Sequence, residues 1–265
     1  MHKNGFFSLL FHAAFVAFIV APLLVVVAMA FTGKGYLSLP TDGLSLRWFG
    51  ALLDNQEMLD AFMLSIKLGL ASATIAALLA IPAALAISRY DFPGRGAVTG
   101  FLLSPLMIPS VVLGIAFLRF FSLAHIGGSL WALTLTHVIV VLPYALRLTL
   151  ASTIGLERDI EQAAMSLGAS RWTAFYRVVL PRIRTGVVGG WMLAFIQSFD
   201  ELTMTVFVAT PGTTTLPVAM YNQISQTIDP LITAISTVLI IGTLLLMLIL
   251  DRMVGLDRVL IGEGK

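Results

Sequence analysis

Cysteine is absent from this 265-residue chain, and charged residues are scarce in it. Without cysteine there is no disulfide, no thiolate metal site and no cysteine nucleophile. Asp, Glu, Lys and Arg make up 11% of the residues, whereas an ordinary soluble domain has about 25%. Hydrophobic residues make up 58%, which is more apolar surface than a water-soluble fold of this length can bury. Composition therefore excludes an ordinary soluble domain and indicates an integral membrane protein.

Recognisable catalytic motifs are also missing. There is no phosphate-binding loop of the form GxxxxGK[ST], so the chain is not itself an ATPase. His125 and His137 have no further ligands in a metal-binding pattern, and no Ser, His and Asp set forms a nucleophile motif. We therefore predict no catalytic residue, no metal, no cofactor and no enzymatic activity of its own, which disfavours a membrane hydrolase.

The apolar residues fall in long continuous runs. A membrane helix needs about 20 such residues, and barrel strands would instead alternate over about 10. The sequence predicts an all-α integral membrane protein with six transmembrane helices, in a single domain over residues 1–265 without internal repeats. The first run could also be a secretory signal, but its length favours a retained helix. The predicted spans are residues 8–31, 61–87, 97–118, 130–148, 186–209 and 231–250.

Basic residues are unevenly distributed between the two sides of these spans. If the N-terminus lies inside, the outside segments carry only Lys34, Arg47 and Arg119. Because Lys and Arg accumulate in cytoplasmic loops, this asymmetry places both termini in the cytoplasm and requires no nucleic-acid partner. The twelve inside residues are Lys3, Arg89, Arg95, Arg147, Arg158, Arg171, Arg177, Arg182, Arg184, Arg252, Arg258 and Lys265.

The longest inside segment, residues 149–185, contains the most informative pattern. Asp159 and Gln162 have the spacing of a capping box at the start of a helix. Gly168 is expected to end that helix in the left-handed conformation, and Ser170 to cap a second helix that ends at Pro181. Two short amphipathic helices joined at a glycine form a rigid bend. It could dock on a partner, or it could lie on the membrane or pack under the bundle.

Residues 161–181, EQAAMSLGASRWTAFYRVVLP, resemble the EAA loop of bacterial ABC-importer permeases. That motif is EAA, three residues, Gly, nine residues, Ile, one residue and Leu-Pro. Val178 replaces the Ile, and the motif glutamate falls on Gln162, with Glu161 one residue early. The matching residues are Ala163, Ala164, Gly168, Leu180 and Pro181.

This resemblance implies the type I ABC-importer permease fold, with a coupling-helix loop between the fourth and fifth spans. It implies a bacterial inner-membrane location and coupling to separate ABC ATPase subunits, which bind the ATP. The implied partners also include a related but different second permease chain, a periplasmic or extracellular solute-binding protein and membrane lipid. The residues that it assigns to ATPase coupling are Glu161, Gln162, Ala163, Ala164, Gly168, Leu180 and Pro181.

The resemblance extends over nearly the whole chain to spermidine/putrescine permeases. It includes SLRWFGALLDN, SPLMIPSVVLGIA and SFDELTMTVFVATPGTTTLPVAMY. It implies transport of a polyamine or another small organic cation. Permeases for iron, phosphonates and opine-like solutes have similar segments and stay alternatives. A self-sufficient secondary transporter is less well supported, because it would not explain the inside loop and would typically have repeated halves.

Three charged residues lie within predicted spans, namely Lys67, Asp200 and Glu201. A charge at the centre of a membrane helix costs about 2.5–3.5 kcal/mol on insertion scales, so each requires an explanation. Lys67 could form an ion pair with one of the acids, or it could extend toward the interface. Alternatively, the three residues could line a translocation path on which the acids attract a cationic solute.

Overall fold

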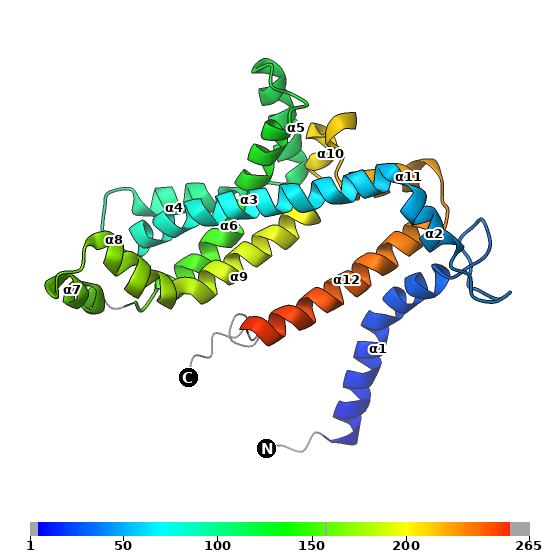
Figure 1. Ribbon diagram of the computed structural model, residues 1–265, viewed down its shortest axis with the longest axis horizontal. Coiled ribbons are helices and arrows are strands. Elements are labelled where there is room, and N and C mark those ends of the chain that lie inside the picture. The colour runs from blue at the N-terminus through cyan, green and yellow to red at the C-terminus, as the bar shows by residue number, and fades with distance from the viewer. Residues whose placement is uncertain (1–4, 157, 255–265) are drawn as a thin grey trace. The chain divides into compact units, whose positions relative to one another are not determined.

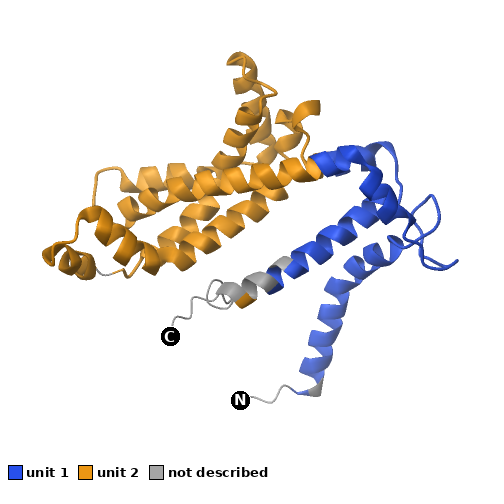
Figure 2. Cartoon of the chain, in the orientation of Figure 1, with its two compact units in different colours: residues 1–60, 219–249 blue, residues 61–218, 250–265 orange. Residues whose placement is uncertain are grey.

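The computed structural model describes residues 5–156 and 158–254, and all the regular secondary structure in these ranges is helical. This confirms the predicted all-α class. The chain divides into two compact units (Figure 2). The first contains residues 1–60 and 219–249, and the second contains residues 61–218 and 250–265.

The first unit contains α1 (Phe6–Met29), α2 (Arg47–Asp54), most of α11 (Leu216–Gln226) and most of α12 (Leu231–Val254). α1 is apolar around its whole circumference and its span is not buried within the chain. Such a helix needs lipid or another protein around it. α2 is a short helix between the first two predicted spans, and its Trp48 indole donates to the Lys34 carbonyl at 3.1 Å.

The second unit is built around α3 (Gln56–Arg89), α6 (Leu130–Thr153) and α9 (Leu180–Phe199) (Figure 1). Small side chains form much of its core, so the backbones approach closely, as is common where membrane helices pack. On α9, Gly186 and Gly190 are spaced as GxxxG and face the backbone of α6. The Trp191 indole also donates to Thr74 on α3 at 3.0 Å. The buried cluster contains Ala73, Ala76, Ala80, Ala84, Ile87, Val141, Ala145, Leu146 and Ala194.

The third predicted span, residues 97–118, is not one continuous helix. α4 (Arg95–Leu103) passes into a 3₁₀ turn, η1 (Ser104–Leu106), and α5 (Ser110–Leu123) then starts in a new direction. The two parts meet at an angle of 98° (Figure 1). Pro105 and Pro109 lack the backbone N–H that a continuous helix needs, and their rings obstruct the preceding turn. Pro109 therefore precedes α5 with extended ψ, as its N-cap.

The helix in the region of the fifth predicted span, residues 186–209, has different bounds from that span. The helical segment already begins at Arg171 and ends at Phe199. It passes through Pro181, which was expected to end a helix. Pro181 is tolerated because it falls in the first turn of α9, directly after a π-helical turn, where its missing N–H is least needed. After Phe199 the chain is irregular up to α10 (Thr205–Val208) and η3 (Pro211–Thr213).

Within the described residues, four helices are long and apolar enough to cross a membrane, and the bent α4–α5 pair would be a fifth. They are Phe7–Met29, Gln56–Arg89, Leu130–Thr153 and Arg171–Phe199. The described apolar part of α12, Leu231–Leu245, is shorter. The count of six spans and the inside location of both termini stay predictions.

Candidate functional site

The segment between α6 and α9 forms two short helices at an angle. We call residues 158–179 the elbow: α7 (Arg158–Ser166), α8 (Arg171–Ala174) and the π-helical η2 (Phe175–Val179). Gly168 follows the last turn of α7, and its φ of +93° is left-handed. The Gly168 N–H donates to the Met165 carbonyl at 2.9 Å, and the Ala169 N–H donates to the Ala164 carbonyl at 3.1 Å. These two bonds form a Schellman motif, which confirms the predicted glycine cap.

The two predicted N-terminal caps have different outcomes. Ser170 precedes α8, and its hydroxyl accepts from the Thr173 N–H at 3.2 Å, as predicted. The predicted Asp159 cap, and with it the capping box to Gln162, is wrong because α7 already begins at Arg158. Asp159 lies inside the first turn instead. There its negative charge still suits the positive end of the helix dipole.

The elbow presents large apolar side chains to its surroundings. Leu167 is 90% exposed and Trp172 is 72% exposed, and Ile160 and Tyr176 are also exposed. The rings of Trp172 and Tyr176 stack with their centroids 6.2 Å apart, which makes this part of the surface rigid. Several exposed apolar side chains on one short segment are typical of an interaction surface.

The predicted coupling residues differ in their exposure. Gln162, Ala163, Gly168 and Pro181 are exposed, whereas Glu161, Ala164 and Leu180 are half-buried. The EAA match therefore does not form one uniform face of the elbow. Its exposed part is available to a partner, and its half-buried part packs toward the rest of the second unit.

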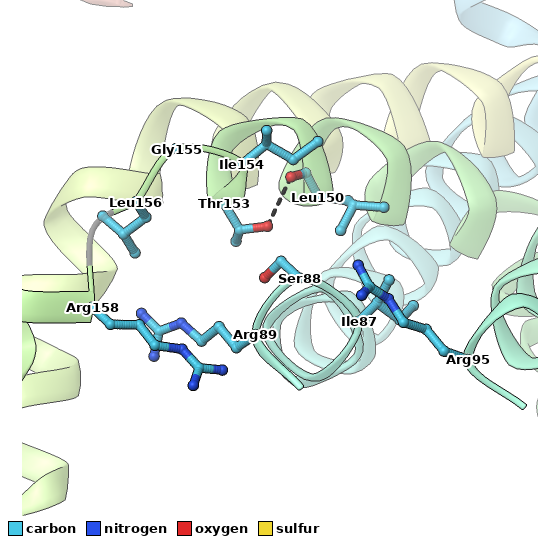
Figure 3. Close-up of a pocket in the computed structure, with 10 residues that line it drawn as sticks. All are labelled: Ile87, Ser88, Arg89, Arg95, Leu150, Thr153, Ile154, Gly155, Leu156 and Arg158. Carbon is cyan, nitrogen blue, oxygen red and sulfur yellow. Dashed lines mark hydrogen bonds between the residues drawn. The ribbon is translucent and has the colours of Figure 1, made fainter. Parts of the chain in front are cut away.

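Glu161 turns toward the end of α3. Its carboxylate accepts a hydrogen bond from the Arg89 guanidinium at 2.5 Å. Beside this pair is a pocket of about 430 Å³ between the ends of α3, α4, α6 and α7, with Arg89, Arg95 and Arg158 among its lining residues (Figure 3). The Arg158 guanidinium lies over the Tyr90 ring, 5.1 Å from its centroid. Sequence reasoning had placed no partner opposite Glu161.

The lysine and the two acids of the predicted spans differ in their surroundings. In the described part of the chain, no ion pair joins Lys67 to Asp200 or Glu201, so the pairing alternative is not realised. Glu201 is only 7% exposed, and its carboxylate accepts from the Met204 N–H at 2.8 Å. It thereby satisfies a backbone donor where the chain is irregular. Asp200 and Lys67 are exposed.

His137 forms a buried polar cluster that the sequence did not reveal. It is fully buried on α6. Its Nδ1 lies 2.8 Å from the Ser198 hydroxyl on α9, and its Nε2 lies 3.1 Å from the Thr205 hydroxyl on α10. Both ring nitrogens are thus hydrogen-bonded, which leaves neither for a metal. The cluster fixes α6 to both sides of the break that contains Asp200 and Glu201.

Comparison with known proteins decides which family has this arrangement. Residues 76–256, which include the elbow and the break after α9, match the family described as "Binding-protein-dependent transport system inner membrane component". The chain belongs to this family. It is a permease component of an ABC importer, located in the inner membrane, and a transport subunit rather than an enzyme.

Individual members of the family resemble the chain over most of its length. The spermidine/putrescine transport system permease protein PotC of Escherichia coli (strain K12) is 28% identical over 248 residues, 94% of this chain and 93% of PotC. The putrescine transport system permease protein PotI of the same strain is 33% identical over 230 residues, 84% of this chain and 82% of PotI.

The fold of this permease has a match among solved structures. A bacterial ABC transporter involved in the import of the acidic polysaccharide alginate matches with a TM-score of 0.69 and 13% identity, over 92% of this chain and 94% of that one. The likeness is one of fold, and it confirms the type I permease class expected from the EAA loop.

Proposed function

We propose that this permease carries a polyamine such as putrescine or spermidine across the membrane and couples to separate ATPase subunits through the elbow. It would form one domain over residues 1–265, with six spans, and work with a second, related permease chain and a solute-binding protein. The observation that carries the coupling part is the Gly168 bend with its exposed apolar side chains.

The elbow suits the role of a transmission lever. Its bend is fixed by a Schellman motif, and its second helix continues without interruption into α9. Short helices packed in this way move as rigid bodies, so a push on the elbow would be transmitted along α9. The exposed residues Gln162 and Ala163 would face the ATPase, and the small side chain of Ala163 would permit close approach.

The polyamine part of the proposal has two supports. PotC and PotI have spermidine and putrescine in their names and are similar to this chain over most of its length. In addition, Asp200 is an exposed carboxylate at the end of α9 without an ion-pair partner among the described residues. An exposed acid within an apolar region is suited to attract an ammonium group.

Uptake measurements test the solute and the role of Asp200 together. Cells that express the whole transport system should take up labelled putrescine or spermidine. Asp200→Asn should raise the KM for the polyamine about 10-fold, because a favourable charge is lost, while the ATPase still co-purifies. Lys67→Met, which removes the opposite charge, is the control and should not raise the KM. Uptake of iron, a phosphonate or an opine in place of polyamines would contradict the proposed solute.

The orientation follows from the twelve basic residues inside and three outside. Reporter fusions after Lys265 and near Ala169 should behave as cytoplasmic, and fusions near Asn55 and Gly212 as external. An external signal near Ala169 would remove the elbow from the side where ATP is hydrolysed. The coupling proposal would then be wrong.

A further inference from the structure

We propose that the Arg89–Glu161 ion pair is an intrachain strut that makes α7 move together with the end of α3, so that Arg89 is a positioning residue for coupling. The inference rests on the proposed coupling role of the elbow and deepens it. It gives Glu161, the acid of the EAA-like segment, a partner within the chain.

The acid at residue 161 faces the interior of the second unit. Only 20% of the Glu161 side chain and 14% of the Arg89 side chain are exposed. Residue 162, one position later, is an exposed glutamine. Successive residues on a helix point about 100° apart, so moving the acid back by one residue turns it from the outer face toward α3. The shift of the acid from residue 162 to residue 161 therefore places it where it pairs with Arg89.

The polarity of the pair agrees with the helix ends that carry it. Arg89 lies in the last turn of α3, and Glu161 lies in the first turn of α7. A positive charge is favoured at a helix C-terminus and a negative charge at an N-terminus. The pair therefore links two helix ends, 72 residues apart in sequence, in the orientation that both ends favour.

The two ends of the strut are not equivalent. Among the residues that the structure describes, the Nε and Nη2 atoms of Arg89 are buried and have no hydrogen-bond partner, and Glu161 is the acid that holds this guanidinium. Without Glu161, a mostly buried cation would lose its counterion, which is costly. Without Arg89, the Glu161 carboxylate would still be favoured by the free N–H groups of the first turn of α7. Glu161→Gln should therefore impair coupling more than Arg89→Gln.

The connection between α3 and α4 offers a matched control. Arg95 and Asp91 also form an ion pair, at 2.9 Å, but the side chains are 42% and 99% exposed and lie within one short stretch of chain. Such exposed pairs contribute little. Asp91→Asn should leave both transport and ATP hydrolysis within about twofold of wild type, although it too removes one carboxylate near α3.

The test measures polyamine transported per ATP hydrolysed in vesicles that contain the complete transporter. Glu161→Gln should lower this ratio on the order of 10-fold, which corresponds to a typical coupling free energy between two sites, and Arg89→Gln should lower it less. Glu161→Asp and Arg89→Lys, which keep the two charges, should have ratios between those of the Gln variants and that of wild type. A variant that merely folded less well would lower transport and hydrolysis in proportion and leave the ratio unchanged.

A cross-link then tests whether residues 89 and 161 can stay joined while the transporter works. Because the chain has no cysteine, an Arg89→Cys, Glu161→Cys double variant carries only the two introduced thiols, which a short bismaleimide can join. Cross-linking should raise the ratio of the double variant several-fold. A cross-link that stops transport, or a wild-type ratio in both Gln variants, would overturn the strut. If wild-type hydrolysis shows no response to solute, the proposed function itself has failed.

Discussion

Gly168→Val should abolish polyamine uptake while leaving the amount of inserted protein close to that of wild type. Gly168 has a φ of +93°, and the left-handed conformation costs an ordinary L-residue roughly 1–2 kcal/mol, with β-branched residues among the least tolerant. No atom of the described residues lies within 4 Å of a Cβ built at this position. The substitution therefore acts on the angle of the elbow and creates no clash with the helices that span the membrane.

Two further variants show whether the elbow's angle is what matters. Gly43 also has a positive φ, +106°, and no described atom within 4 Å of a Cβ, but it lies far from the elbow in sequence. Gly43→Val should therefore retain uptake. Gly168→Asn should retain much of it, because asparagine adopts the left-handed conformation more readily than other residues. Wild-type uptake and ATPase co-purification in Gly168→Val would mean that this bend does not transmit coupling.

Gly190→Leu should remove most of the folded permease from the membrane. A Cβ at residue 190 would lie 2.9 Å from the carbonyl oxygen of Ala145 and 3.1 Å from its Cα atom. Both atoms belong to the backbone of α6, so no side chain can move aside and α6 and α9 must separate. Overpacking typically costs about 1–3 kcal/mol, occasionally more, and we expect a loss at the upper end of this range.

The matched control for this substitution is Gly100→Leu. Gly100 also lies in a helix of the second unit, α4, but in the described part of the chain no atom lies within 4 Å of a Cβ there. Gly100→Leu therefore tests the effect of adding leucine to an apolar helix without a clash. The measurement is the yield of monodisperse protein and its thermal unfolding in detergent. Equal unfolding midpoints for Gly190→Leu and wild type would contradict the close packing of α6 against α9.

Features with a local cause were predictable from sequence. The apolar runs lead directly to α1, α3, α6 and α12, because such runs satisfy their backbone groups only by forming helices in an apolar environment. Gly168 and Ser170 were identified as caps because their preferred conformations are intrinsic to those residue types. The EAA-like spacing likewise identified the elbow, whose shape depends on consecutive residues.

Features that depend on tertiary contacts were missed. Hydropathy does not reveal that the chain after Phe199 is irregular, because that backbone is satisfied by side chains such as Glu201 and by protein around it. The pairing of Arg89 with Glu161 joins residues 72 positions apart, and no periodicity relates them. The break at Pro105 and Pro109 had a visible cause, but the size of a proline kink depends on what packs against it.

The most direct test of the account is solute-stimulated ATP hydrolysis in proteoliposomes that contain this permease, its partner permease, the ATPase and the binding protein. We predict that putrescine-loaded binding protein increases hydrolysis several-fold with the wild-type chain and not with Gly168→Val, although the variant inserts normally. Equal stimulation by wild type and Gly168→Val, or stimulation that persists when this chain is omitted, would contradict the claim that this permease couples solute transport to the ATPase through its elbow.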